Sequence, residues 1–79
     1  MPTSLPAATV LDREFLAVRA RLIDLAAALD RIDRAEGDLD GDPRPANIRR
    51  SLEVLAGDAT DRAQRVQIIF SLPYNENWQ

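Results

Sequence analysis

The stretch TVLDREFLAVRARLIDLAAALDRIDRAEG, residues 9–37, decides the fold. Its apolar residues recur at alternating steps of four and three, which places them along one side of an α-helix. This apolar seam consists of Leu11, Phe15, Val18, Leu22, Leu25, Leu29 and Ile32. A strand would need apolar residues at every second position instead. The spacing predicts one long helix over about residues 10–36, roughly 40 Å in length.

Polar residues at both ends of the stretch fit the ends of a helix. Thr9 and Asp12, three residues apart, resemble a capping box that satisfies the first backbone N–H groups. Arg31 and Arg34 would lie near the negative end of the helix dipole. Gly37 can adopt the left-handed conformation that often follows a helix.

Leu16 and Ile23 lie about 100–140° around the predicted helix from the seam. With them, the middle of the helix is apolar over roughly half its circumference, which is wider than a two-stranded coiled coil needs. The helix must therefore be covered from two directions. Arg19 projects within this arc. Either its stem lies on apolar surface with the guanidinium in water, or it forms a partly buried ion pair with Glu53 or Asp61.

A chain of 79 residues makes one small domain, which we place at residues 9–79 after a flexible arm at residues 1–8. There is no cysteine, which suits a reducing cytoplasm and leaves association with another chain as the way to enlarge the core. No apolar run is long enough to span a membrane. The net charge of −3 argues against nucleic acid as a main partner.

Residues 38–45, DLDGDPRP, form the sharpest break in the chain, because Asp, Gly and Pro together mark a turn. Alternating Asp38, Asp40 and Asp42 suggest a calcium loop, but the register fails. Counting from Asp38, Pro43 stands where the loop needs Gly and Arg49 stands where it needs Glu. We therefore expect a solvated loop whose last Asp caps the next helix, and no bound metal.

Two shorter helices are predicted, over about residues 43–56 and 59–71. Asp42 is a good N-cap for the first, and Pro43 fits its first position. Gly57 ends that helix, and Asp58 or Thr60 can cap the next. The apolar stripe of the third helix comprises Ala59, Ala63, Val66 and Phe70, with Ile69 beside it. Ile68 and Leu72 fall on the opposite side.

The tail at residues 73–79 contains two of the four aromatic residues of the chain. Tyr74 and Trp78 combine a large apolar area with a polar group. Trp78 either folds back over the open end of the bundle or inserts into another protein as an anchor.

The composition excludes several kinds of catalytic chemistry. Without His, Cys or Lys there is no Ser-His triad, thiol nucleophile, Schiff-base lysine or His/Cys zinc site. The pairs Asp30–Asp33 and Asp58–Asp61 could act as acid and base, but they also fit ordinary surfaces and caps. We predict that the chain is not an enzyme and binds no cofactor.

The segments ALDRIDRA (28–35), DPR (42–44) and DRAQRVQIIFSLPYNENW (61–78) resemble a set of small helical bacterial proteins without an assigned activity. The resemblance covers most of the chain after the arm. It implies that the aromatic tail belongs to the domain, and it implies no catalytic residues.

The sequence thus predicts an all-α, three-helix antiparallel bundle in which the two short helices cover the long one. Its expected core is Phe15, Val18, Leu22, Leu25, Leu29, Ile48, Leu52, Leu55, Val66, Ile69 and Phe70. The leading functional hypothesis is a protein-protein interaction module that forms a homodimer or binds another protein. Its candidate interface is Leu16, Arg19, Ile23, Ile68, Leu72, Tyr74 and Trp78. The alternative is a small regulator that binds nucleic acid through Arg62 and Arg65 of the third helix.

Overall fold

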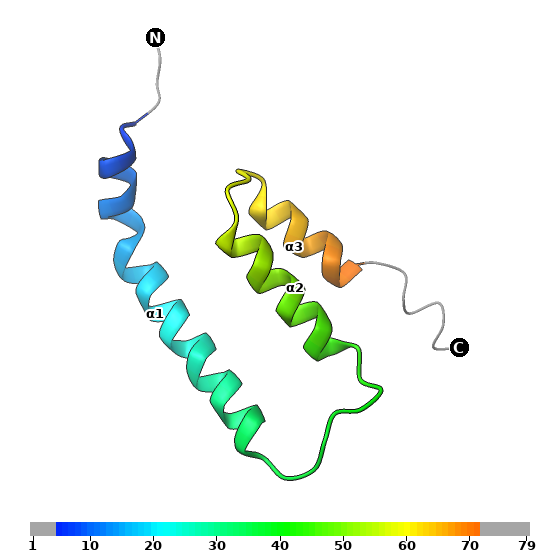
Figure 1. Cartoon of the computed structure of the whole chain (residues 1–79). Coiled ribbons are helices and arrows are strands. Elements are labelled where there is room, and N and C mark those ends of the chain that lie inside the picture. Colours follow the sequence, from blue (N-terminus) through cyan, green and yellow to red (C-terminus); the bar gives the residue numbers. More distant parts are fainter. Residues whose placement is uncertain (1–4, 72–79) are drawn as a thin grey trace. The chain divides into compact units, whose positions relative to one another are not determined.

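The computed structural model of the chain describes residues 5–71. These residues form three α-helices, α1 (Ala7–Arg34), α2 (Arg44–Ala56) and α3 (Arg62–Ser71), and no strand. The chain divides after Gly37 into one unit with α1 and another with α2 and α3 (Figure 1). The predicted all-α class, with one long and two short helices, is confirmed. The covering of the long helix by the short ones and the single domain at residues 9–79 stay predictions.

Helix α1 is a single unbroken helix of 28 residues. It begins directly after Pro6, three residues earlier than predicted, because Ala7 and Ala8 are strong helix formers that extend it upstream. The Val10 N–H donates to the Pro6 carbonyl at 3.1 Å. Thr9 is therefore inside the helix, and its predicted capping box with Asp12 is wrong. Of the predicted arm, residues 1–4 lie outside the described part of the chain.

The other end of α1 comes at Arg34, two residues before the predicted boundary. The Ala35 N–H donates to the Ile32 carbonyl at 3.2 Å and closes the last turn. Arg31 and Arg34 lie in that turn, where positive charge is favourable. Gly37 has the predicted positive φ, +93°, but it turns the following loop instead of capping the helix.

No residue of α1 is buried. Phe15, Val18 and Leu22 are exposed, whereas Leu25 and Leu29 are half-buried. The expectation that the first three belong to a core beneath the short helices stays a prediction. Neighbours one turn away on the same helix cover part of each side chain, and full burial needs a second element.

Helix α2 begins at Arg44, one residue later than predicted, so Pro43 takes the N-cap position that the sequence assigned to Asp42. The Asp42 Oδ1 nevertheless accepts a hydrogen bond from the N–H of Arg44, the first helical residue, at 2.9 Å. Gly57 ends the helix with an extended φ of −85°, not a left-handed one. Helix α3 begins at Arg62, three residues later than predicted. Asp61 therefore precedes it, in place of Asp58 or Thr60, and the Asp61 carbonyl accepts from the Arg65 N–H at 3.1 Å.

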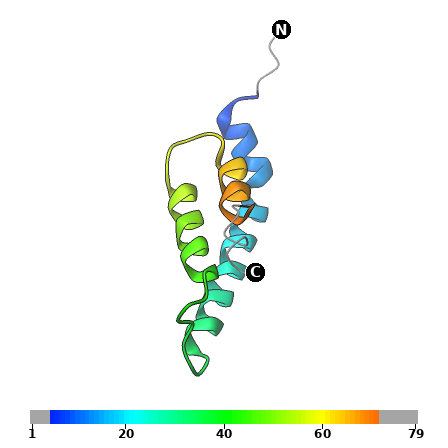
Figure 2. The same ribbon diagram turned by 90° about the vertical axis from the view of Figure 1, so that its right-hand side faces the viewer.

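Helices α2 and α3 pack side by side and run in opposite directions (Figures 1 and 2). Among the described residues, Ile69 is the buried apolar residue of this hairpin, and Asn47 and Ser51 are buried polar ones. Ile48 and Leu52 of α2 and Val66 of α3 are half-buried. Leu55 and Phe70 are exposed on this hairpin, and their assignment to a core shared with α1 stays a prediction. The buried side of α3 passes through Ile69, about 100° from Phe70.

Asn47 and Ser51 lie one turn apart on the buried side of α2. The Ser51 hydroxyl donates to the Asn47 backbone carbonyl at 2.8 Å, so the serine satisfies its own polar group within the helix. Within the described part of the chain, the buried Nδ2 of Asn47 has no hydrogen-bond partner. A buried donor without a partner costs about 1–3 kcal/mol, so Asn47 weakens this hairpin.

We expect Asn47→Leu to raise the free energy of unfolding by about 1 kcal/mol, because it removes that unsatisfied donor and adds apolar contact. Urea denaturation followed by circular dichroism measures the change. Asn47→Asp is the matched comparison. It keeps the size but buries a charge, and it should destabilise the chain by about 2 kcal/mol or more. Equal stability of the two variants would contradict the buried position of this side chain.

Candidate interaction surfaces

A continuous apolar arc runs along α1 and is made of the seam and the flanking pair Leu16 and Ile23. Leu16 is 75% exposed and Ile23 51% exposed. In the seam, Leu11 and Leu22 are 60% and 57% exposed. Both parts of the arc therefore present side chains that lose unfavourable contact with water when another surface covers them.

Arg19 lies within this arc and is exposed. The ion pairs within residues 5–71 are Asp42–Arg44 and Asp61–Arg65. Asp61, one predicted partner of Arg19, is thus paired with Arg65 instead. The other interpretation of Arg19, a stem on apolar surface with its head in water, agrees with its exposure.

The rest of the predicted interface comes from α3 and the segment after it. Ile68 is 49% exposed on α3. Leu72, Tyr74 and Trp78 lie outside the described residues. Phe70, which the apolar spacing assigned to the core, is 45% exposed and adds a second apolar side chain to this helix. Ile68 and Phe70 are two positions apart and so face different sides of α3.

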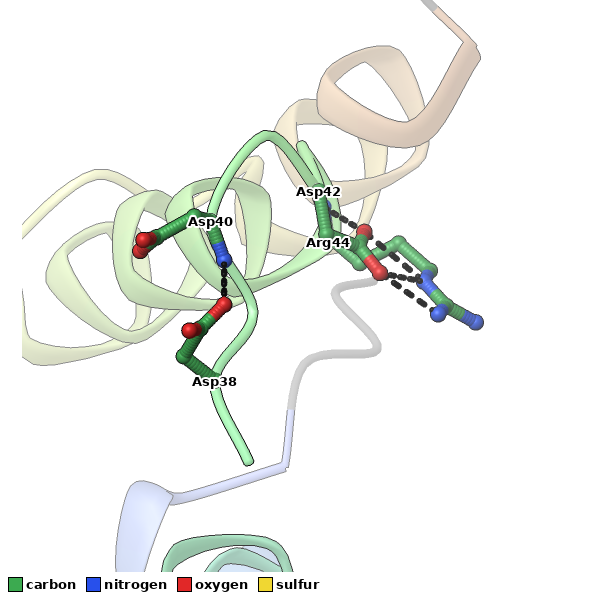
Figure 3. A network of polar contacts seen from close by, with 4 residues as sticks. All are labelled: Asp38, Asp40, Asp42 and Arg44. Atoms are coloured by element: carbon green, nitrogen blue, oxygen red, sulfur yellow. Dashed lines mark hydrogen bonds and ion pairs between the residues drawn. The ribbon is translucent and has the colours of Figure 1, made fainter. Parts of the chain in front are cut away.

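The loop before α2 is organised by its own acidic side chains (Figure 3). The Asp38 Oδ1 accepts from the Asp40 N–H at 3.1 Å, and the Asp42 N–H donates to the Leu39 carbonyl at 3.0 Å. Gly41 has a φ of +83°, the value that the third position of a type II turn requires. The closely spaced aspartates Asp38 and Asp42 thus take part in the hydrogen bonds of the turn.

The carboxylate of Asp42 is held by Arg44. The Arg44 Nε lies 3.0 Å from Oδ1, and the Arg44 Nη2 lies 2.6 Å from Oδ2. These side-chain hydrogen bonds, together with the one from the Arg44 backbone N–H, lower the pKa of Asp42 from 3.8 to about 2. Asp42 therefore points its oxygens at Arg44 and the helix start. Within residues 5–71 no group of three acidic side chains is placed to hold a metal ion.

The two arginines proposed for nucleic-acid binding make contacts within their own unit. The Arg62 Nη2 donates to the Gly57 carbonyl at 2.5 Å, and the Arg65 Nε lies 2.6 Å from the Asp61 Oδ1. Hydrogen bonding from Arg65 lowers the pKa of the Asp61 carboxyl below its ordinary value. An ionised Asp61 beside Arg65 reduces the positive field that phosphate binding needs.

No family model, curated protein or solved structure matches this chain. The resemblance of residues 28–35, 42–44 and 61–78 to small helical bacterial proteins therefore stays a prediction. Among the described helices, none has the length and apolar character needed to cross a membrane.

Arg44 should control the titration of Asp42. The pKa of Asp42 is lower in the folded chain than in the unfolded chain, so ionised Asp42 stabilises the start of α2. This contribution is complete above pH 3.8 and is lost as the pH falls to about 2. We expect carbon-detected NMR to give Asp42 a pKa of about 2. Arg44→Gln should raise it towards 3.8.

The control for this titration is Arg65→Gln, which removes the partner of Asp61 at the other end of the hairpin. It should raise the pKa of Asp61 and leave that of Asp42 unchanged. A wild-type Asp42 that titrates near 3.8 would contradict the contact with Arg44.

Proposed function

We propose that this protein is a small protein-protein interaction module that self-associates through α1. The observation that supports the proposal is the exposure of the apolar arc, which follows the helix while no residue of α1 is buried. Monomeric proteins seldom leave continuous apolar surface of this kind in water. The lack of cysteine suits a reducing compartment, and the proposed setting is the cytoplasm.

The magnitude of the effect agrees with reversible association. Full burial of a large aliphatic or aromatic side chain contributes about 1.5–3 kcal/mol. The exposed seam residues are roughly half covered already, so each still offers about 1 kcal/mol. Summed over the seams of two copies, the gain is on the order of 10 kcal/mol. The loss of rotational and translational freedom on association costs about 4–15 kcal/mol. The two terms are similar in size, so the oligomer should depend on concentration.

The chain favours this role over nucleic-acid binding because of where its charges lie. Arg62 and Arg65 of α3 bind the Gly57 carbonyl and the Asp61 carboxylate. Helix α1, in contrast, combines a continuous apolar arc with charged residues on both sides of its seam. Such a helix recognises another amphipathic helix by covering apolar area and pairing charges.

Leu22→Glu tests the proposal at the centre of the seam. A charge placed there would have to be buried in the associated state, so self-association should weaken by a factor of about 100 or more. Sedimentation equilibrium from about 1 µM to 1 mM gives the average mass of wild type and variant over the range where weak association is visible.

Ala20→Glu is the control, because it adds the same charge to the same helix on the side roughly opposite the seam. Its association should match that of the wild type. A wild type that stays monomeric throughout, or equal effects of Leu22→Glu and Ala20→Glu, would overturn binding through the seam.

A further inference from the structure

We propose that the partner of α1 is α1 of a second copy, paired as a parallel, in-register coiled coil in which Glu14 of each copy faces Arg19 of the other. This inference rests on the proposed function and specifies the partner, its direction and its register. Three features of the described chain support it: the period of the seam, the charges beside the seam and the surroundings of those charges on their own helix.

The seam repeats every seven residues over the whole of α1. Phe15, Leu22 and Leu29 occupy the first position of the repeat, and Leu11, Val18, Leu25 and Ile32 the fourth. A strict seven-residue repeat, with an average step of 3.5, keeps two supercoiled helices in contact along their length. Seven such positions in a helix of 28 residues are enough for a continuous contact between two copies. This contact covers the seam and leaves Leu16 and Ile23, which lie outside it, open to a further surface.

The charges that border this seam match when two copies run parallel. In a parallel pair, the seventh position of a repeat faces the fifth position of the next repeat on the partner helix, five residues further along. Glu14 then faces Arg19 of the second copy, and symmetry makes this pair twice. Arg21 faces Ala26, and Ala28 faces Asp33. No two like charges meet.

The antiparallel alternative is less well matched. Its longest overlap opposes Val18 of one copy with Leu22 of the other, and the positions that flank the seam then face their own counterparts. This alignment places Arg19 within one helical turn of Arg19 of the second copy. Arg21 is brought equally close to its own counterpart. Two repulsive contacts between arginines replace the two attractive pairs of the parallel arrangement.

Glu14 and Arg19 have no charged neighbours within reach on their own helix. Helical neighbours lie three and four positions away. Around Glu14 these positions hold Val10, Leu11, Ala17 and Val18; around Arg19 they hold Phe15, Leu16, Leu22 and Ile23. Both charged residues are exposed, and neither belongs to an ion pair among residues 5–71. A second copy supplies the opposite charge that α1 itself does not provide.

Charge reversal in the full-length chain tests this pairing. Glu14→Arg places an arginine opposite Arg19 of the second copy, and Arg19→Glu places a glutamate opposite Glu14. Each variant alone should therefore self-associate about tenfold more weakly than the wild type. An equimolar mixture of the two variants restores opposite charges at both contacts and should associate as strongly as the wild type. The double variant Glu14→Arg/Arg19→Glu should do the same on its own.

Analytical ultracentrifugation gives the self-association constants, and fluorescence transfer between differently labelled variants gives the association in the mixture. Asp24→Arg and Arg13→Glu are the controls, because they change the charge by the same amounts at exposed positions of α1 away from the seam. Both should associate like the wild type. Circular dichroism should show equal helix content in the variants that exchange Arg and Glu, since these residues have similar helix propensities, and no loss of helix in Asp24→Arg.

A wild type that remains monomeric would refute self-association and this pairing with it. A wild type that associates while the mixture stays as weak as the single variants would refute the parallel register and leave the proposed function standing. Self-association of either single variant at wild-type strength would likewise refute the contact between Glu14 and Arg19.

Discussion

Everything else in this chain depends on how α1 keeps its apolar seam away from water. The helix forms readily because its sequence is rich in Ala, Leu and Arg, but a helix by itself can cover only part of each side chain. Leu11 and Leu22 remain more than half exposed, and Leu16 is exposed still further. The hydrophobic effect therefore favours any state in which a second surface covers this helix.

The hairpin of α2 and α3 shows how little core a short segment can build. Ile69 is its buried apolar residue among those described, and Asn47 and Ser51 take up the rest of the buried positions. Local hydrogen bonds hold the ends of the two helices instead. Asp42 accepts hydrogen bonds from the backbone and side chain of Arg44 at the start of α2, while Arg62 and Arg65 bind groups just before α3. Polar contacts at the helix ends thus supplement a small apolar contact between the helices.

The number, order and type of the helices could be predicted from the sequence, because the spacing of apolar residues and the positions of helix-breaking residues act locally. The step of three and four identified α1, and Asp42, Pro43 and Gly57 marked the limits of α2. The start of α1 could not be predicted well, since Thr9 offered a capping pattern while Ala7 and Ala8 favoured an earlier start. The helix propensity of Ala7 and Ala8 decided the start, and the capping pattern at Thr9 was not used.

Burial was harder to predict because it depends on which side of each helix meets a neighbour. Ile69 and Phe70 are adjacent apolar residues, and packing against α2 selects the first. Asn47 and Ser51 are buried although their polarity argues for exposure, so no apolar pattern could reveal them. For the candidate surface, Leu16, Arg19 and Ile23 are exposed, and their part in an interface stays a prediction. Which surface covers the seam could not be predicted, because the period of the apolar residues gives the side of the helix and not its neighbour.

Self-association through α1, as proposed, would tie the survival of the chain to its abundance. A fold that gains stability by association gains it by mass action, so dilution shifts the balance towards the open chain. Newly made copies that are still monomeric would expose Leu11 and Leu22 to chaperones and proteases. Degradation of the protein would then slow as its concentration rises. A self-associating α1 would in this way make the lifetime of the protein depend on its concentration.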